Sequence, residues 1–513
     1  MNGADAVIAT LADNGVEACF ANPGTSEMQL VSALDREPRI RPVLCLFEGV
    51  ATGAADGYGR MAGKPAATLL HLGPGYANGI ANLHNARRAG TPIVNVIGDH
   101  ATYHRRFDAP LSSDVEALAR PNSRWIGVAR DADDAADLAA IAVRESFGPP
   151  GGGASLILPA DCAWSPATRK GVVLARPVRR APAADRVEAA ARAVRTARKP
   201  MVLIGGQACE AQGLRSASRL AAHGVRVITD TFVPRQARGA GCFNPDRMLY
   251  FAEMALADLA GSDLMVLAGT GEPVAFFAYP AMPSLLTPEG CAPLTLAGKD
   301  EDAILALEAL ADALGAPAFS ASNDAVSYAS PNGEINPYTV GASIARHMPQ
   351  QTVISDDAVT SGLPVFMQTK AAAPHDWLSL TGGAIGQGLP LAVGAAVACP
   401  DRKVVALTGD GAGMYTLQAL WTMARESLDV TVVVFANHSY RILGVELIRT
   451  GAGAPGAAAA SLLDLGDPRL DWLALASGMG VPAVRCVTAE WFDATFAAAM
   501  GQTGPLLIEV ALG

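Results

Sequence analysis

Short, continuous apolar runs recur along the whole chain and alternate with alanine-rich stretches of helical length. Strands that are covered by helices on both faces need such runs, because neither face of the sheet meets water. The alternation therefore predicts an α/β protein with helices on both sides of parallel sheets. The runs expected to form strands are residues 67–70, 93–97, 156–158, 201–204, 225–228, 264–267, 404–407 and 430–435.

Two polar segments interrupt this alternation. Residues 165–187 are rich in Pro and Arg, and residues 315–337 are rich in Ser, Ala, Asn and Pro, so both are expected to be exposed connections. The 513-residue chain is long enough for about three domains of ~100–200 residues each. We therefore predict three doubly wound parallel-sheet domains, which span residues 1–165, 185–315 and 335–513.

The composition argues against several classes of protein. Hydrophobic residues make up 50% of the chain, which is ample for packed cores and argues against disorder. Asp and Glu total 49 against 39 Lys and Arg, whereas nucleic-acid-binding proteins normally carry a basic face. The 8 Cys residues form no CxxC pair, so neither a disulfide framework nor a structural zinc site is expected.

No segment is typical of a secreted or membrane protein. Residues 1–5 lack the basic region and apolar stretch of a secretory signal. The most apolar long segment, residues 382–399, is interrupted by glycines, Gln387 and Pro390, which favours a buried loop and helix over a membrane span. We expect a cytoplasmic protein that binds neither membranes nor nucleic acids.

The most specific local pattern lies in the last predicted domain. An apolar strand precedes the turn Gly409-Asp410-Gly411, and a helix and a second strand lead to Asn437. Glycines allow a ligand to approach the backbone, and open α/β sheets bind ligands at the carboxyl ends of their strands. The Asp410 carboxylate, the Asn437 amide oxygen and a nearby carbonyl would suit Mg²⁺ shared with a phosphate. Backbone N–H groups near Ala412 would also face that phosphate. An ordinary strand–turn–helix connection with a capping Asp is the alternative.

A second acidic residue stands in the first predicted domain. Glu48 follows an apolar stretch and precedes a helix of small residues, 49–57. A carboxylate at the end of an apolar strand is poorly solvated, so we expect it to have a strong hydrogen-bond partner. By itself, Glu48 could equally be a helix N-terminal residue that the helix dipole favours.

Taken together, these motifs resemble those of thiamine diphosphate (ThDP) enzymes. The pattern of GDG, helix, strand and Asn is similar to their diphosphate-binding motif, although the usual Asn-Asn is here Ala436-Asn437. The other matching segments are NPGTSE at 22–27, HLGPG at 71–75 followed by Asn78, and GGAIG at 382–386. The resemblance covers essentially the whole chain, in the order pyrimidine, middle and diphosphate domain.

The resemblance implies a role for each acidic motif. Asp410, Asn437 and the backbone carbonyl of Ser439 would hold Mg²⁺. Glu48 would lie beside the aminopyrimidine ring of ThDP and activate the coenzyme. The thiazolium would then serve as the electron sink when a 2-oxo acid loses CO₂.

The same resemblance implies how the coenzyme is bent and shared. Ile385 would lie as a wedge under the coenzyme, and the Gly383 carbonyl would accept a hydrogen bond from its 4′-amino group. In this family the Glu of one subunit meets the diphosphate domain of another. The implied assembly is therefore a homodimer or homotetramer with a shared active site and a small 2-oxo acid as substrate.

Several polar residues are candidates for substrate contact. His71 stands where typical acetolactate synthases have Ser, and is more like the His of decarboxylases that takes part in proton transfer. Thr25 and Ser26 could orient the substrate, and His100 could reach it. A core histidine at 71 and a surface histidine at 100 are the alternatives.

Within the family, the sequence is most similar to a short, divergent branch of acetolactate synthase large subunits. The segments that carry this likeness are ANPGTSEM, LFEGVATGAADGYGR, LLHLGPG, GDHATYH and LTGGAIG. We therefore predict ThDP- and Mg²⁺-dependent decarboxylation of a 2-oxo acid with carboligation, of the type that converts pyruvate to 2-acetolactate. The alternatives are simple decarboxylation, as in benzoylformate decarboxylase, and a catalytically idle ThDP-fold interaction protein. The binding of FAD and the need for a regulatory subunit stay open.

Overall fold

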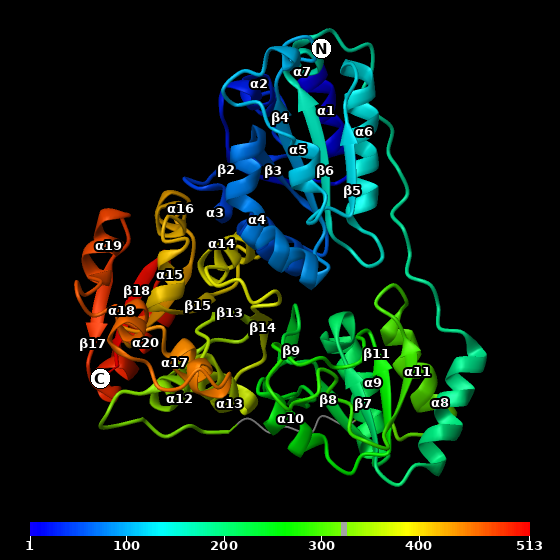
Figure 1. Cartoon of the computed structure of the whole chain (residues 1–513), viewed down its shortest axis with the longest axis vertical. Helices are drawn as coiled ribbons and strands as arrows, with labels where there is room; N and C mark the ends of the chain where they lie inside the picture. The colour runs from blue at the N-terminus through cyan, green and yellow to red at the C-terminus, as the bar shows by residue number, and fades with distance from the viewer. Residues whose placement is uncertain (320–325, 513) are drawn as a thin grey trace.

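Three parallel sheets, each covered by helices, organise the chain (Figure 1). The structure is a computed structural model that describes residues 1–319 and 326–512. The predicted fold class is confirmed, and each apolar run expected to form a strand coincides with a parallel strand, although Val225 lies just before β8. Part of the predicted second connection, residues 320–325, lies outside the described residues.

The N-terminal sheet has six strands and is covered by helices on both faces. Its order is β2 (Arg41–Leu44), β1 (Ala18–Asn22), β3 (Ala66–His71), β4 (Ile93–Asp99), β6 (Gly153–Pro159) and β5 (Trp125–Val128). Its helices are α1 (Gly3–Asp13), α2 (Met28–Leu34), α3 (Glu48–Ala62), α4 (Leu72–Ala89), α5 (Val115–Ala119), α6 (Ala132–Ser146) and α7 (Ala160–Trp164).

The middle sheet follows a long connection that runs along the outside of the molecule (Figure 1). Its order is β10 (Asp246–Arg247), β8 (Arg226–Thr229), β7 (Pro200–Ile204), β11 (Leu264–Ala268) and β12 (Ala292–Ala297). Its helices are α8 (Ala184–Thr196), α9 (Ala211–Ala222), α10 (Ala252–Leu259) and α11 (Ala303–Ala313).

The C-terminal sheet has seven strands. Its order is β17 (Ala483–Cys486), β18 (Leu506–Ala511), β16 (Val430–Ala436), β15 (Val404–Gly409), β13 (Thr352–Asp357), β14 (His375–Ser379) and β9 (Gln236–Arg238). Its helices are α12 (Pro337–His347), α13 (Gly362–Gln368), α14 (Gly388–Ala398), α15 (Asp410–Met414), α16 (Ala419–Arg425), α17 (Arg441–Arg449), α18 (Ala457–Leu463), α19 (Trp472–Gly478) and α20 (Ala489–Met500).

Two local features differ from the expectation. The strand β9 comes from the middle part of the sequence but pairs antiparallel with β14 of the C-terminal sheet. Its three residues form no apolar run, and the buried Arg238 guanidinium lies over the ring of Phe366 at 3.3 Å. The single helix expected after Gly411 is divided into α15 and α16. The expected loop and helix over 382–399 are present, with a mostly buried helix and a loop that is half-buried over residues 382–385. No helix in the described part of the chain could cross a membrane.

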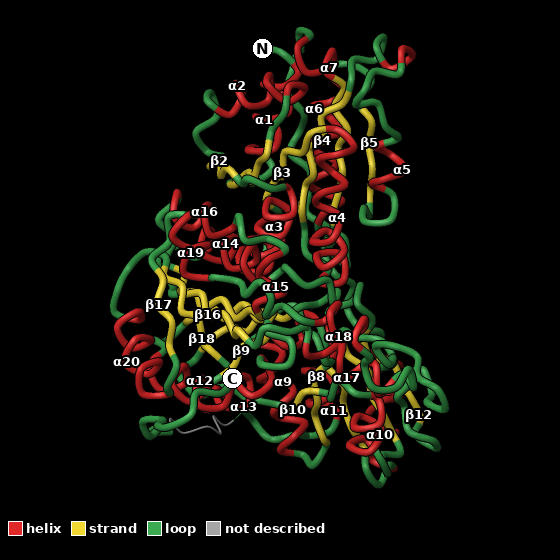
Figure 2. The backbone as a smooth tube through the Cα atoms, turned by 60° about the vertical axis from the view of Figure 1, so that its left-hand side comes forward, coloured by secondary structure: helices red, strands yellow, loops and turns green. Residues whose placement is uncertain are grey.

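The helices α3 and α14 join the N-terminal and C-terminal domains, and they lie side by side in both ribbon views (Figures 1 and 2). Small residues let the two backbones touch. A Cβ atom on Gly57 would lie 2.0 Å from the Leu391 carbonyl oxygen, and one on Gly394 would lie 1.8 Å from that of Ala54. This contact fixes the position of the N-terminal end of α3 relative to the C-terminal sheet.

A buried carboxylate anchors the loop that precedes α14. Asp357, at the end of β13, accepts hydrogen bonds from the backbone N–H groups of Gly386 (2.8 Å) and Gly388 (3.1 Å). Burial raises the pKa of Asp357 to about 7, although these N–H groups act in the opposite direction. The loop 382–387 is therefore tied to the sheet by a group that titrates near neutral pH.

We predict that the variant Gly394→Ala destabilises the fold, because its methyl group would overlap the backbone of α3. The free energy of unfolding is expected to fall by roughly 1–3 kcal/mol, as for other overpacked interfaces. Chemical denaturation measures this change. The matched control is Gly444→Ala in α17, where a Cβ atom meets nothing within 4 Å, and this variant is expected to be neutral or slightly more stable. Equal stability of the two variants would contradict the packing described.

The raised pKa of Asp357 predicts a pH dependence of stability. The folded chain keeps a proton on this carboxyl that the unfolded chain releases, so stability should fall as the pH rises from 3.8 to about 7. Asp357→Asn removes the titrating group and keeps an acceptor oxygen, so it should flatten this slope. Denaturation across that pH range measures it, and the exposed Asp401→Asn is the control. An unchanged slope in Asp357→Asn would refute the assignment.

Candidate active site

Glu48 is the first residue of α3, and only 7% of its surface is exposed. Its Oε2 accepts a hydrogen bond of 2.9 Å from Nδ2 of Asn78 on α4. The two helices are held together here, because the Thr52 hydroxyl donates to the Gly79 carbonyl at 3.0 Å. The strong hydrogen-bond partner expected for this carboxylate is therefore present.

His71 belongs to a network that centres on a buried glutamate. Glu27 is fully buried and accepts hydrogen bonds from the backbone N–H of Gly24 (2.7 Å) and from the Ser26 hydroxyl (2.6 Å). Its Oε2 lies 2.8 Å from Nδ1 of His71. A carboxylate only accepts hydrogen bonds, so Nδ1 carries the proton in this arrangement. Nε2 makes no hydrogen bond to any described residue and is left available for chemistry.

Glu48 and His71 both pack against Gly75 of α4. A Cβ atom on Gly75 would lie 3.2 Å from Oε1 of Glu48 and 3.2 Å from Cβ of His71. Leu72, directly after His71, has a φ of +50°, which is left-handed backbone that a non-glycine residue rarely adopts. Such strain persists only where the surroundings enforce it, and it is concentrated at functional sites.

The other candidates for substrate contact lie in different surroundings. The Ser26 oxygen is part of the Glu27–His71 network, whereas the neighbouring Thr25 is exposed. His100 is half-buried just after β4, and its ring lies 5.4 Å from that of His104. Among the described residues, no hydrogen bond joins His100 to His71, so the structure does not bring these two histidines into one network.

Sequence reasoning missed Glu27, although it stands in the matching segment 22–27. Nothing in the local pattern distinguishes it from a surface carboxylate at a turn. Its position becomes informative only because β3 and β4 bring His71 and Gly98 beside it, where a Cβ atom on Gly98 would lie 1.7 Å from its Oε1. His71 and Glu27 therefore form one hydrogen-bonded pair.

The residues predicted to hold a metal lie together at the ends of β15 and β16. Oδ2 of Asp410 accepts a hydrogen bond of 2.6 Å from the backbone N–H of His438, and Oδ1 of Asn437 accepts one of 3.0 Å from that of Ser439. The Ser439 carbonyl accepts no hydrogen bond from any described residue. Burial raises the pKa of Asp410, and the N–H groups of His438 and Gly411 oppose this effect.

This oxygen set fits a magnesium ion. Among the described residues, no group of three or more His, Cys, Asp and Glu side chains is placed to hold a metal, so amide and backbone oxygens would have to complete the shell. Carboxylate, amide and carbonyl oxygens are what Mg²⁺ prefers, and it usually keeps water and substrate phosphates as its other ligands. His438, between Asn437 and Ser439, has a φ of +54°, which is left-handed backbone that a non-glycine residue rarely adopts.

Space for a phosphate lies next to these oxygens. A Cβ atom on Gly409 would meet nothing within 4 Å, whereas one on Gly411 would lie 2.5 Å from the Tyr440 ring. Gly409 therefore leaves an opening at the end of β15, and Gly411 permits close packing behind it. Backbone N–H groups at the start of α15, which includes Ala412, complete a cradle suited to a diphosphate.

The loop 382–386 is held by the N-terminal domain. Nδ2 of Asn85 on α4 donates to the Ala384 carbonyl at 2.8 Å, and Nε2 of His84 lies 3.1 Å from the Gly382 carbonyl. Gly383 has a φ of +75°, and a Cβ atom there would lie 2.4 Å from the ring of Phe276. Ile385 is half-buried. Gly383 and Ile385, which are predicted to bend the coenzyme, therefore lie in a turn that side chains of α4 hold in place.

The candidate residues form two clusters that no described hydrogen bond or ion pair connects. Among the described residues, no hydrogen bond or ion pair joins the cluster around Glu48, Glu27 and His71 to the cluster around Asp410 and Asn437. A coenzyme with an aminopyrimidine at one end and a diphosphate at the other fits both clusters chemically. The carboxylate is suited to a ring nitrogen, and the oxygen set is suited to a metal-bound diphosphate.

Comparison with known proteins agrees with this chemistry. The chain matches the models of the thiamine pyrophosphate enzyme N-terminal TPP binding domain over residues 1–118 and of the C-terminal TPP binding domain over residues 362–510. It is 48% identical, over 100% of its length and 99% of the relative's, to a Mycobacterium tuberculosis protein named "Putative acetolactate synthase large subunit IlvX". It is 27% identical to benzoylformate decarboxylase from Pseudomonas aeruginosa, over 97% of this chain and 96% of that protein.

A solved structure shows the same fold. The thiamine diphosphate-dependent 4-hydroxybenzoylformate decarboxylase of Rhodococcus jostii RHA1 superposes with a TM-score of 0.85 at 23% identity, covering 100% of this chain and 99% of that one. The family models match both ends of the chain, and the Mycobacterium tuberculosis relative is similar along its full length. The chain therefore belongs to the family of thiamine pyrophosphate enzymes.

Proposed function

We propose that the protein uses ThDP and Mg²⁺ to decarboxylate a 2-oxo acid and then returns a proton to the product, releasing an aldehyde. The observation that carries this proposal is the His71–Glu27 pair beside Glu48. Release of an aldehyde needs a proton at the carbon atom that has lost CO₂, and this pair can supply one. A histidine oriented through Nδ1 presents Nε2 as a proton donor or acceptor near neutral pH.

The chain's own residues have distinct tasks in this proposal. Glu48 holds or accepts a proton at the aminopyrimidine ring. Glu27 keeps the His71 ring in one orientation and stabilises its protonated form, as buried carboxylates do for catalytic histidines. Asp410, Asn437 and the Ser439 carbonyl would bind Mg²⁺ and through it the diphosphate. When bound, ThDP supplies the electron sink for the loss of CO₂.

Among the described residues, no hydrogen bond or ion pair joins the two clusters within one chain, which is compatible with a shared site. We infer that Glu48 of one chain acts with Asp410 of a second copy, in a dimer or a larger assembly. Exposed apolar side chains lie near the metal-binding end on α17 and α18, where Ile448 is 65% and Leu462 is 78% exposed. Apolar side chains exposed near a site are suited to covering by another subunit.

Carboligation of the acetolactate synthase type is the second candidate. It is favoured by the 48% identity to the Mycobacterium tuberculosis relative that carries that name. Both candidates share the coenzyme, the metal and the loss of CO₂. They differ in whether a proton or a second 2-oxo acid is added afterwards.

Product analysis separates the two candidates. With ThDP, Mg²⁺ and either pyruvate or benzoylformate, we expect aldehyde and CO₂ in equal amounts, because His71 can protonate the product. Gas release and chromatography measure the two, and a reaction without ThDP is the control. If 2-acetolactate were the main product from pyruvate, simple decarboxylation would be refuted in favour of the second candidate.

The role of Glu48 is tested with Glu48→Gln. Loss of the ionisable group should lower kcat by about 100-fold or more, the usual scale of acid–base catalysis, because the coenzyme is no longer activated. Binding of ThDP, measured by calorimetry with Mg²⁺, should stay close to that of the natural protein. The exposed Glu188→Gln on α8 is the control. Unchanged turnover in Glu48→Gln would show that coenzyme activation does not depend on this carboxylate.

A further inference from the structure

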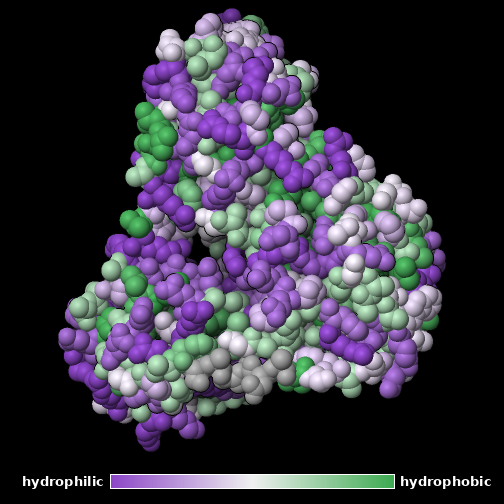
Figure 3. Space-filling view, turned by 180° about the vertical axis from the view of Figure 1, so that it is seen from behind, coloured by the Kyte–Doolittle hydropathy of each residue, from purple (hydrophilic) through white to green (hydrophobic). Residues whose placement is uncertain are grey.

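A cavity of about 670 Å³ separates the N-terminal domain from the middle domain. It is lined by the ends of α3 and α4, by loops of the middle sheet and by the connection before α8. Seen from behind, the molecule is hollowed below the N-terminal domain (Figure 3). At the edge of this cavity the three domains meet at one buried ion pair, which Asp56 and Arg60 of α3 form.

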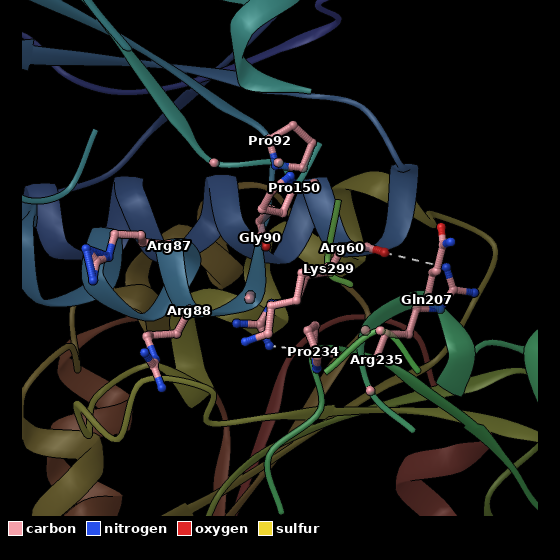
Figure 4. Close-up of a pocket in the computed structure, with 18 of the residues that line it drawn as sticks. Arg60, Arg87, Arg88, Gly90, Pro92, Pro150, Gln207, Pro234, Arg235 and Lys299 are labelled. Atoms are coloured by element: carbon pink, nitrogen blue, oxygen red, sulfur yellow. Dashed lines mark hydrogen bonds between the residues drawn. The ribbon is translucent and has the colours of Figure 1, made fainter. Parts of the chain in front are cut away.

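The guanidinium of Arg60 binds groups of both other domains. Its Nη1 donates to the Pro234 carbonyl of the middle domain at 3.1 Å, a contact that Figure 4 shows, and to the Ser379 carbonyl at the end of β14 at 2.8 Å. Its Nη2 donates to the Thr381 hydroxyl at 3.0 Å. Only 1% of the side chain is exposed, so these bonds form away from water. Arg60 therefore holds the segment that leads into the coenzyme loop, residues 382–386.

Asp56 holds the other end of the same loop. Its Oδ2 accepts a hydrogen bond of 2.6 Å from Nε2 of Gln387, the residue directly before α14. The Asp56 side chain is fully buried, and 1% of Gln387 is exposed. The two members of one ion pair on α3 therefore fasten the coenzyme loop at its entry and at its exit.

The loop between these two points has little structure of its own. Residues 382–387 belong to no helix or strand, and Gly383 (φ +75°) and Gly386 (φ +91°) have left-handed backbone. Glycines leave a loop many alternative conformations, so its shape depends on contacts from outside. Asp357 and Thr416 supply such contacts from the C-terminal domain. The ends and the centre of the loop are held by α3 and α4 of the N-terminal domain.

The chemistry of the ion pair favours a positioning role over a stabilising one. Desolvating two charges costs about as much free energy as their attraction gains, and apolar residues of similar size often replace such pairs without loss of stability. A buried pair does provide direction, because a guanidinium carries its N–H donors in one rigid plane. Arg60 uses this plane to bind Asp56 together with two backbone carbonyls and a hydroxyl.

We propose that Arg60 and Asp56 are positioning residues, which set the shape of the coenzyme loop before the coenzyme binds. The inference rests on the proposed function only for the identity of the ligand, ThDP. A loop that already has its binding shape does not have to be ordered by the ligand, so the apparent affinity is higher. Weakening the ion pair should therefore release the loop even in the protein without coenzyme.

Hydrogen exchange in the coenzyme-free protein tests the hold on the loop. Arg60→Lys keeps a positive charge beside Asp56 but loses the planar fork, so a lysine cannot reach all of these acceptors together. The backbone N–H groups of residues 382–387 should exchange roughly 10-fold faster or more in this variant, because loss of the hydrogen bonds makes local opening easier. Exchange at the rate of the natural protein would overturn the proposal.

Arg235→Lys is the matched control. Arg235 lies beside Arg60 (Figure 4), with its Nη1 3.5 Å from the Arg60 carbonyl, and it joins the middle domain to the C-terminal sheet through Asp376 at 2.8 Å. Among the described residues it makes no hydrogen bond to the coenzyme loop. A general loosening of the domain junction would speed exchange of the loop equally in both variants, and this outcome would refute a positioning role.

Calorimetry with ThDP and Mg²⁺ tests the consequence for the coenzyme. Arg60→Lys should weaken ThDP binding by roughly 10-fold, because the binding-competent loop is less populated, whereas Arg235→Lys should bind ThDP as the natural protein does. Thr381→Val removes the hydroxyl that Arg60 and the Asn85 carbonyl hold, so it should act in the same direction. Thr381→Ser keeps that hydroxyl and should bind normally.

The outcomes separate the inference from the proposed function. If the natural protein did not bind ThDP, the proposed function would fail, and the exchange experiment would still decide whether Arg60 holds the loop. If the natural protein bound ThDP and both Arg60→Lys and Thr381→Val bound it equally well, the positioning role would be wrong. The two Thr381 variants decide the question by themselves if Arg60→Lys folds poorly.

Discussion

The contact between α3 and α14 is the constraint on which the rest of the structure depends. Beside the glycine contacts lies an ion pair whose Asp56 side chain is fully buried. Asp56 accepts from Arg60 (2.6 Å), from the Thr91 hydroxyl (2.6 Å) and from Gln387 Nε2 (2.6 Å), so its charge is fully satisfied. Removal of one partner of a buried pair typically costs about 3–5 kcal/mol.

This contact connects the chemistry of the two domains. Arg60 also donates to the Ser379 carbonyl and to the Thr381 hydroxyl, directly before the loop that would bend the coenzyme. The helix that carries Arg60 begins at Glu48, and α4 begins directly after His71. The two helices thus join the acid–base groups to the coenzyme loop.

Much of the fold could be predicted from local pattern. Apolar runs of strand length, alternating with alanine-rich segments, correctly indicate parallel sheets covered on both faces. The strand β9 could not be predicted, because its three residues form no apolar run and become a strand only where β14 offers a free edge. The candidate site could likewise be predicted only in part. Asp410 and Asn437 can be identified from their spacing, whereas the importance of Glu27 depends on a contact with His71 across 44 residues of sequence.

The sequence by itself determined the α/β class, the order of the motifs and the chemical type of each candidate group, because these depend on residue type and on spacing along one strand or turn. Only the tertiary structure decided which groups meet. It paired Glu27 with His71 and brought α3 of the N-terminal domain into contact with α14 of the C-terminal domain. Such contacts arise from packing between distant segments, and no local periodicity encodes them.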